Sequence, residues 1–406
     1  MKKLLLIIIV FVTSLSYCQT AEEYFERGIS KADLQDYQGA IADFSKVIEL
    51  DPNSNVTYFN RGLSKYKLED YRGAIADYSK GIELDPNYSA AYNNRGLSKA
   101  DLQDYQGAMA DYSKAIELNP NYSDAYNNRG LSKAYLKDYQ GAIADYSKAI
   151  ELDPNYSGAY NNRGLSKADL QDYQGAIADY SKGIELDPNY SKAYVFRGLS
   201  KDDLQDYQGA VADFSKAIEL DPNYSFVYVN RGLSKDDLQD YQGAIADYSK
   251  AIELDPNDSY AYYNRGYSKF DLQDYQGAIA DYSKAIELDP NYSKAYVFRG
   301  LSKYNLQDYQ GAIADYSKAI ELNPNDSFVY VNRGISKADL KDYKGAIADF
   351  SKAIELDPND SYAYYSRGLS KLELNQKESA CLDFNKAKEL GNQEAIEEIK
   401  KNCNKK

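Results

Sequence analysis

An all-α fold of repeated helical hairpins is predicted by three features of the sequence. The chain divides into twenty N-terminal residues, eleven blocks of 34 residues and a twelve-residue tail. Each block contains two amphipathic stretches joined by a short polar turn. All ten prolines recur at 34-residue intervals, at Pro52, Pro86, Pro120, Pro154, Pro188, Pro222, Pro256, Pro290, Pro324 and Pro358. A fixed period of this length is typical of a solenoid, in which each unit stacks on its neighbours.

The block that begins at Ser89 indicates how one unit folds. Ser89 is expected to cap a first helix that runs to about Leu102, and Asp104 to cap a second helix that runs to about Leu118. Pro120 ends the second helix because proline disfavours the α conformation of the residue before it. The apolar residues of the second helix recur at spacings of three and four, at Tyr105, Ala108, Met109, Tyr112, Ala115 and Ile116. One hairpin cannot cover such a stripe, so neighbouring hairpins must stack.

Counted from Ser89 as position 1, the unit resembles the tetratricopeptide repeat. That family has aromatic residues at positions 4 and 24, small residues at 8, 20 and 27, and proline at 32. The corresponding residues here are Tyr92, Tyr112, Gly96, Ala108, Ala115 and Pro120. The resemblance implies a right-handed α-solenoid superhelix whose concave groove is lined by first helices and holds a peptide or partner protein. Two departures are lysine at position 11 in every unit and Asn392 in place of the last proline.

The resemblance covers residues 21–394 and predicts eleven tetratricopeptide units. Their expected bounds are 21–54, 55–88, 89–122, 123–156, 157–190, 191–224, 225–258, 259–292, 293–326, 327–360 and 361–394. Residues 395–406 are expected to form a capping helix and tail, with the closing helix over Ala395 to Cys403. A terminal cap explains why the last unit lacks its proline, because no further hairpin follows it.

The first 18 residues have the pattern of a secretory signal peptide. Lys2 and Lys3 precede the apolar run from Leu4 to Val12, which is too short to span a bilayer, and a cut near residues 18 and 19 is expected. The mature chain then has no transmembrane segment, and its location is periplasmic or extracellular, as in an exported bacterial protein. One alternative is a lipoprotein in which Cys18 carries the lipid, although Tyr17 is bulky for such a site. Another is an uncleaved anchor.

Composition argues against several classes of function. The chain has no histidine, which removes imidazole as a general base or metal ligand, and no phosphate-cradling loop, nucleophile elbow or zinc spacing occurs. Loss of Lys2 and Lys3 with the signal leaves 46 basic and 62 acidic residues, a net charge of −16. Nucleic acid is therefore not an expected partner. We expect no catalytic residue, no cofactor and no metal.

Residues that are the same in all units are interpreted as structural. Glycine fills position 8 in all eleven units, from Gly28 to Gly368, which indicates a close approach of the two helices. Positions 4, 17 and 24 hold 28 of the 43 tyrosines, which are interpreted as core residues. The repeated Asp111, Lys114 and Glu117 are expected to pair weakly along an exposed face.

A ligand groove is predicted from the positions that change most between units. In the first helix these are positions 2, 5, 6, 12 and 13, which form one stripe roughly 120° wide. Paired amides occupy the stripe in units three to five, and aromatic residues edged by acids occupy it later. The candidate groove residues are Asn93, Asn94, Asn127, Asn128, Asn161, Asn162, Phe226, Tyr260, Tyr263, Phe270, Tyr304, Phe328, Tyr362 and Tyr365. Some of these aromatic side chains have the alternative role of packing against the next hairpin.

A disulfide is predicted between Cys381 and Cys403, the two cysteines of the mature chain. Cys381 is at position 21, where the other ten units carry isoleucine, valine or methionine, so it should face the next element of the stack. That element is the closing helix with Cys403. Both cysteines are equally distant from Asn392, the expected turn, so a hairpin brings them to the same height. In the alternative, Cys381 is a small core residue and Cys403 is a free thiol in the tail.

These observations favour an exported, non-enzymatic scaffold that binds a protein or peptide. An amide row offers donors and acceptors to a peptide backbone or to sugar hydroxyls, whereas aromatic residues beside acids suit apolar or cationic segments. One alternative is a glycan-binding or structural protein of the cell envelope. Another is an accessory domain of an enzyme, which is disfavoured because the repeats leave no room for a further domain.

Overall fold

Every regular element in the described part of the chain is a helix. The computed structural model describes residues 20–403, which form 23 α-helices and one π-helix and contain no strand. The expected signal peptide and Cys18 lie outside these residues. The described residues divide into two compact units, one that ends at Pro188 and one that begins at Asn189. No helix within residues 20–403 is long and apolar enough to cross a membrane.

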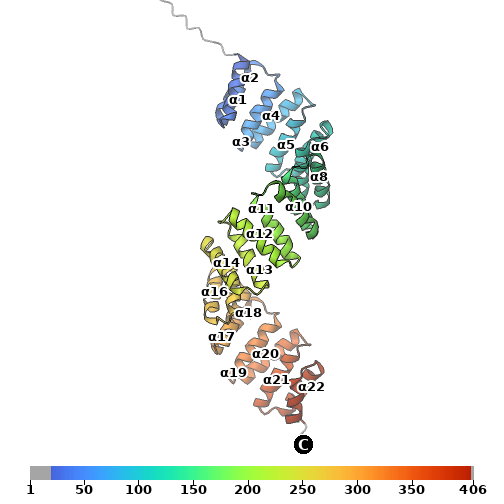
Figure 1. Cartoon of the computed structure of the whole chain (residues 1–406). Helices are drawn as coiled ribbons and strands as arrows, with labels where there is room; N and C mark the ends of the chain where they lie inside the picture. Colours follow the sequence, from blue (N-terminus) through green and yellow to red (C-terminus); the bar gives the residue numbers. More distant parts are fainter. Residues whose placement is uncertain (1–19, 404–406) are drawn as a thin grey trace, which may run out of the picture. The chain divides into compact units, whose positions relative to one another are not determined.

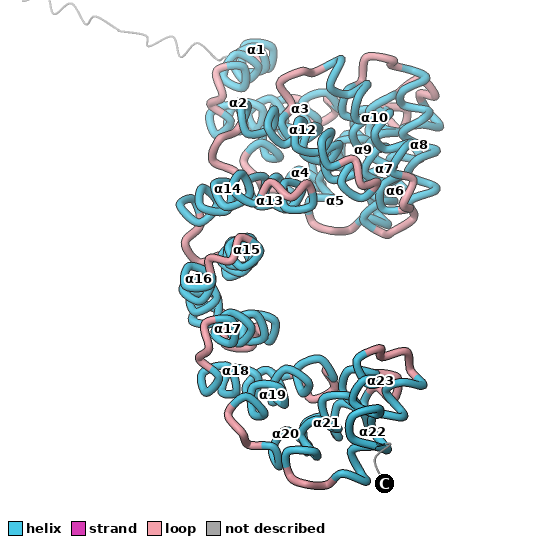
Figure 2. The backbone as a smooth tube through the Cα atoms, turned by 60° about the horizontal axis from the view of Figure 1, so that its bottom comes forward, coloured by secondary structure: helices cyan, strands magenta, loops and turns pink. Residues whose placement is uncertain are grey.

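The first unit consists of five helical hairpins, α1 to α10. Short turns join the consecutive helices (Figures 1 and 2). Each helix packs against the next one along the chain. The helices are α1 (Ala21–Asp33), α2 (Tyr37–Leu50), α3 (Asn55–Lys67), α4 (Tyr71–Leu84), α5 (Ser89–Asp101), α6 (Tyr105–Leu118), α7 (Ser123–Tyr135), α8 (Tyr139–Leu152), α9 (Ser157–Asp169) and α10 (Tyr173–Leu186).

The second unit contains six hairpins and a short closing segment. Its helices are α11 (Ser191–Asp203), α12 (Tyr207–Leu220), α13 (Ser225–Asp237), α14 (Tyr241–Leu254), α15 (Ser259–Asp271), α16 (Tyr275–Leu288), α17 (Ser293–Asn305), α18 (Tyr309–Leu322), α19 (Ser327–Asp339), α20 (Tyr343–Leu356), α21 (Ser361–Glu373), α22 (Lys377–Glu389), α23 (Glu394–Glu398) and η1 (Ile399–Cys403). The all-α solenoid of helix-turn-helix pairs predicted from the sequence is therefore confirmed.

Ten of the eleven second helices in residues 20–403 start at an aspartate cap, as predicted for Asp104, and the exception is α22, which follows Gln376. The carboxylate of Asp104 accepts a hydrogen bond from the amide of Gly107 at 2.9 Å. A Cβ atom added to Gly107 would lie 2.1 Å from that carboxylate, so the cap itself requires glycine at position 19. The turn before the cap places position 15 in the left-handed region, with φ of 64° at Gln103. The first helix differs from expectation, because Tyr88 is its N-cap and Ser89 already lies inside it.

The core of each hairpin forms where glycine at position 8 meets an aromatic ring at position 24. A Cβ atom on Gly96 would lie only 2.7 Å from the ring of Tyr112, which explains why all eleven units keep glycine here. Ala108 and Ala115 are fully buried beside this ring. The close approach predicted for glycine is thus a contact with a ring of the second helix.

An ion-pair network fixes the two helices of each hairpin to one another. The carboxylate of Asp145 accepts hydrogen bonds from Nε and Nη2 of Arg129 at 2.9 and 2.7 Å, and pairs with Nζ of Lys133 at 2.7 Å. Arg129 also donates to Ser113 in the preceding hairpin and lies over the ring of Tyr126. Arginine, lysine and aspartate occupy positions 7, 11 and 23 in all eleven units, and the same pairs recur in each.

The network corrects the prediction that Asp111, Lys114 and Glu117 pair along one exposed face. Lys114 and Glu117 do form an exposed pair at 2.6 Å. Asp111 instead lies inside the hairpin and binds Arg95 and Lys99. The same contacts account for lysine at position 11, which departs from the family pattern.

The tyrosines at position 24 differ in whether their buried hydroxyl groups are hydrogen-bonded, which allows a matched test of the core. Within residues 20–403, the hydroxyl of Tyr316 is buried without a hydrogen-bond partner, whereas that of Tyr248 donates to Asp236 at 2.7 Å. Four units carry phenylalanine at this position, so the site accepts that ring. We expect Tyr316→Phe to raise the free energy of unfolding by about 1 kcal/mol, because a buried polar group without a partner is removed.

The control for this substitution is Tyr248→Phe, which removes a bonded hydroxyl from the same kind of site. We expect it to lower the free energy of unfolding by about 1 kcal/mol. Urea unfolding followed by circular dichroism measures both variants. Equal effects of the two substitutions would contradict the difference in hydrogen bonding between Tyr316 and Tyr248.

Candidate functional site

The paired amides of the predicted groove lie partly inside the structure. Asn93, Asn127 and Asn161 are buried between helices. The amide of Asn162 donates to Oδ1 of Asn127 at 3.0 Å, and Asn128 donates to Asn93 at 3.2 Å. These bonds form a ladder between neighbouring hairpins. We therefore assign the position-5 amides to the interface between hairpins, and only the position-6 amides Asn94, Asn128 and Asn162 stay partly accessible.

Several predicted groove aromatics of the second unit also pack between hairpins. Tyr263 contacts the rings of Tyr292 and Phe298, with centroids 4.9 and 5.9 Å apart. Phe270 likewise packs against Phe298 at 6.0 Å. Tyr365 lies against Phe384 in the last hairpin. Tyr263 and Phe270 thus pack against the next hairpin, the role that the sequence left as an alternative, whereas Tyr365 packs within its own hairpin.

The remaining predicted aromatics differ in their exposure. Tyr304 is half-buried, and its hydroxyl donates to Asp339 at 2.8 Å. The candidates at position 2 are exposed, at Phe226, Tyr260, Phe328 and Tyr362. This row is the part of the predicted aromatic surface in the second unit that a partner can reach.

Two adjacent cavities open between the first helices of the first unit. The first cavity, of about 330 Å³, lies between α5 and α7 and is lined by Leu97, Ala100, Asp101, Gln103, Tyr105, Tyr112, Asn128, Leu131, Ser132 and Tyr135. The second cavity, of about 280 Å³, lies between α7 and α9 and is lined by Leu131, Ala134, Tyr135, Tyr139, Tyr146, Asn162, Leu165, Ser166 and Asp169. Leu131 and Tyr135 line both cavities, which we call the pocket pair.

Tyr135 is the residue of this site that sequence reasoning did not single out. Its side chain is 67% exposed and stacks on Tyr105, with centroids 4.8 Å apart and ring planes within 9°. It occupies position 13, where no other unit has an aromatic residue and seven have aspartate. That exception was the available signal: the predicted stripe included position 13, but every candidate residue named on it lies at position 2, 5, 6 or 12.

The corresponding places in the second unit are filled by its own side chains. Asp202 and Asp236 occupy position 12, where the pocket pair has Ala100 and Ala134. Ser234 donates to Asp202, and Ser268 donates to Asp236 at 2.7 Å. These two acids therefore turn into the structure, although the acids beside the aromatic residues were predicted to lie along the edge of the groove.

The inward position of Asp236 changes its acidity. Burial raises the pKa of Asp236 to about 6, against the lowering effect of the hydrogen bonds from Tyr248 and Ser268. Burial also raises the pKa of Asp202. The pKa of each aspartate rises because its carboxylate is removed from solvent and is bonded by hydroxyl groups instead.

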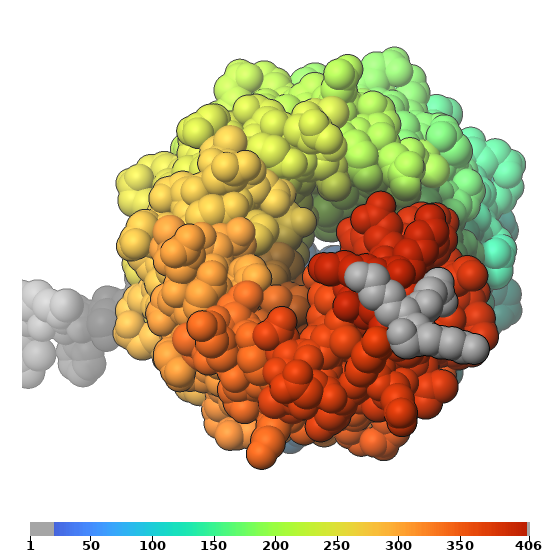
Figure 3. Space-filling view, turned by 90° about the horizontal axis from the view of Figure 1, so that it is seen from below, coloured from blue at the N-terminus to red at the C-terminus, as the bar shows by residue number. Residues whose placement is uncertain are grey.

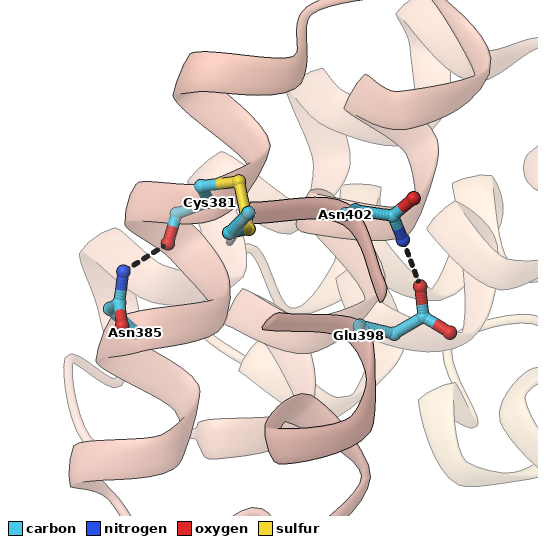
Figure 4. The surroundings of a disulfide bond; sticks show 5 residues. Cys381, Asn385, Glu398 and Asn402 are labelled. Carbon is cyan, nitrogen blue, oxygen red and sulfur yellow. Dashed lines mark hydrogen bonds between the residues drawn. A yellow bond between two sulfur atoms is a disulfide. The ribbon is translucent and has the colours of Figure 1, made fainter. Parts of the chain in front are cut away.

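The two cysteines predicted to pair are joined at the end of the second unit. Cys381 on α22 and Cys403 in η1 form a disulfide with a Cα–Cα distance of 5.7 Å. Figure 4 shows this link beside Asn402, whose amide donates to Glu398. Ala395 on α23 is buried against α22, so this closing segment covers the last hairpin, which belongs to the orange-red to red C-terminal surface in Figure 3. The segment starts at Glu394 and continues as a π-helix, where one regular helix was expected.

Family models match most of the chain. Models described as tetratricopeptide repeat match residues 21–54, 56–88, 89–122, 123–156, 157–190, 191–224, 259–292, 293–326, 327–360 and 350–381. A model described as TPR repeat matches residues 237–273. Nine of these matches each coincide with one helical hairpin, whereas the matches to residues 237–273 and 350–381 begin in one hairpin and end in the next.

Solved structures with similar folds include several short repeat proteins. A MamA protein is 28% identical, with 42% of this chain and 94% of that chain covered and a TM-score of 0.39. YrrB, described as a TPR protein with an unusual peptide-binding site, is 23% identical, with 45% and 95% covered and a TM-score of 0.40. A tetratricopeptide repeat protein from Parabacteroides merdae is 20% identical, with 61% and 98% covered and a TM-score of 0.45. No match was found among curated proteins.

Proposed function

Because the chain belongs to the tetratricopeptide repeat family, whose members bind protein partners, we propose that it is a non-enzymatic scaffold for an extended segment of a partner protein. The observation that carries this proposal is the pocket pair. Its two cavities repeat at the spacing of the hairpins and share the exposed ring of Tyr135. Each is at the lower end of the range for ligand pockets, about 300 Å³, which suits single side chains of a longer ligand.

We also propose that the scaffold acts after export. The support is the pattern of residues 1–18 and the pair Cys381 and Cys403, because a disulfide persists in an oxidising compartment. Cys18 remains the residue that would carry a lipid in the alternative form. Fractionation of cells that produce the full chain, with mass spectrometry of its N-terminus, distinguishes the two forms.

Selection from a random peptide library tests the binding function. We expect the purified protein to enrich peptides, and Tyr135→Asp to weaken their binding by about tenfold, because the ring shared by both cavities is lost. Aspartate is the usual residue at this position and the side chain is exposed, so the variant should fold. The matched control is Tyr190→Asp, which alters an exposed tyrosine outside the pocket pair.

A glycan array run with the same protein tests the alternative function. The alternative drew on the paired amide row, of which Asn93, Asn127 and Asn161 are buried. Enrichment of glycans in place of peptides, with the same loss in Tyr135→Asp, would favour the envelope role and contradict the peptide proposal.

A further inference from the structure

We infer that the pocket pair binds arginine side chains of the partner segment. This inference rests on the proposed function and specifies the chemistry that its site recognises. It concerns only the first unit, where α5, α7 and α9 carry the lining residues.

The charge of the pocket pair favours a cation. Asp101 lines the first cavity and Asp169 lines the second, and neither cavity is lined by a lysine or an arginine. The nearby Lys99 and Lys133 are already paired with the buried Asp111 and Asp145. Each cavity is thus lined by one carboxylate and by no lysine or arginine that could pair with it.

The aromatic lining favours arginine among cations. Tyr135 stacks on Tyr105 through one face, and its large exposure leaves ring surface available to a ligand. A guanidinium is planar, stacks on such a face and binds a carboxylate with two nitrogens. The hairpins themselves hold arginine in this way, since Arg129 lies over Tyr126 at 5.5 Å while binding Asp145. The pocket pair presents the same two kinds of group without an arginine of its own.

Serine hydroxyls in the two cavities point to a polar ligand independently. Nine of the eleven serines at position 10 donate to the carbonyl four residues earlier. Ser132 and Ser166 do not make this bond within residues 20–403, and they are the two that line the pocket pair. Ser132 is 2% exposed and lines the first cavity, whereas the hydroxyl of Ser166 in the second cavity hydrogen-bonds with Tyr146. A serine hydroxyl that does not bond its own helix can donate to or accept from a ligand in the cavity.

The second unit contains an internal comparison for these hydroxyls. Ser234 and Ser268, at the same position, donate to Asp202 and Asp236 of the preceding hairpin. The corresponding residues of the pocket pair are Ala100 and Ala134, which leave the space open. Aspartate at these two alanines is therefore expected to bond Ser132 and Ser166 and to close both cavities.

The first experiment measures binding of synthetic peptides to the purified protein by fluorescence anisotropy. The probes are labelled peptides with two arginines separated by glycine linkers of several lengths. The matched control peptides carry citrulline, which is neutral and has nearly the same shape. We expect one linker length to bind best and its citrulline form to bind at least about tenfold more weakly. Equal binding of the arginine and citrulline peptides would overturn the inference.

The second experiment separates pocket binding from general attraction to an acidic protein. Ala100→Asp combined with Ala134→Asp adds two negative charges, so general attraction predicts tighter binding of the arginine peptide. Closure of the cavities predicts weaker binding, by about tenfold. Asp101→Asn with Asp169→Asn should also weaken binding, whereas the control pair Asp203→Asn with Asp237→Asn, in the second unit, should not. Unchanged or tighter binding by the double aspartate variant overturns the inference.

These outcomes distinguish the inference from the proposed function. If the library yields neutral peptides whose binding depends on Tyr135, the scaffold function holds and the arginine inference is wrong. If no peptide binds at all, both are wrong. Circular dichroism of each variant shows that the helices are intact in either case.

Discussion

Replacement of Asp145 by alanine is expected to lower the free energy of unfolding by about 3–5 kcal/mol, the effect of removing one partner of a buried ion pair. Asp145 is 4% exposed and bonds both Arg129 and Lys133, which stay largely covered when it is removed. Two cations are then left beside each other without the carboxylate. Urea unfolding followed by circular dichroism gives the change in stability.

The control for Asp145 lies on the same helix. Glu151→Ala removes an exposed acid that pairs with Lys148 at 2.6 Å, and we expect a change of about 0.5 kcal/mol or less. Similar effects of the two substitutions would show that the network contributes no more than a surface ion pair. Arg129 also binds Ser113 of the preceding hairpin, so the loss at Asp145 should spread to that neighbour.

Opening the disulfide is expected to have the second largest effect, a loss of about 3 kcal/mol in the stability of the last hairpin. Cys381 and Cys403 are 22 residues apart in sequence, and the bond restrains the end of the solenoid, where only one neighbour supplies packing. Cys381→Ser with Cys403→Ser should therefore increase hydrogen exchange in α22 and α23. Reduced wild-type protein should match the variant.

Thiol titration of the unfolded protein under non-reducing conditions checks the bond itself. We expect neither Cys381 nor Cys403 to react. Two free thiols in these positions would contradict the disulfide and leave Cys381 as a small residue beside the core.

The fold was predictable because one unit determines the rest. The aspartate cap at Asp104, the proline at position 32 and the glycine at position 8 act within one hairpin, and the 34-residue period repeats them. Local turn chemistry of this kind can be read from the sequence. The position of Ser89 was mistaken because a serine near a helix start is a common cap, whereas here Tyr88 takes that place without a side-chain bond.

The candidate site was predictable only in part, because burial depends on the neighbouring hairpin. Position 5 changes between units, yet Asn93 and Tyr263 face the next hairpin, so variation there reflects matched packing between neighbours. Asp111 repeats in every unit like a solvated charge, but its partners are 12 and 16 residues earlier in the chain. No spacing rule for one helix relates residues on two different helices.

Photo-crosslinking from position 135 tests the central claim most directly. The protein would carry a photoreactive phenylalanine in place of Tyr135, or in place of the partly exposed Lys148 on α8 as the control, and would be irradiated with a peptide selected from the library. We predict cross-links to the peptide from position 135, and few or none from position 148. Cross-links from position 148 alone would contradict a partner segment held at the pocket pair.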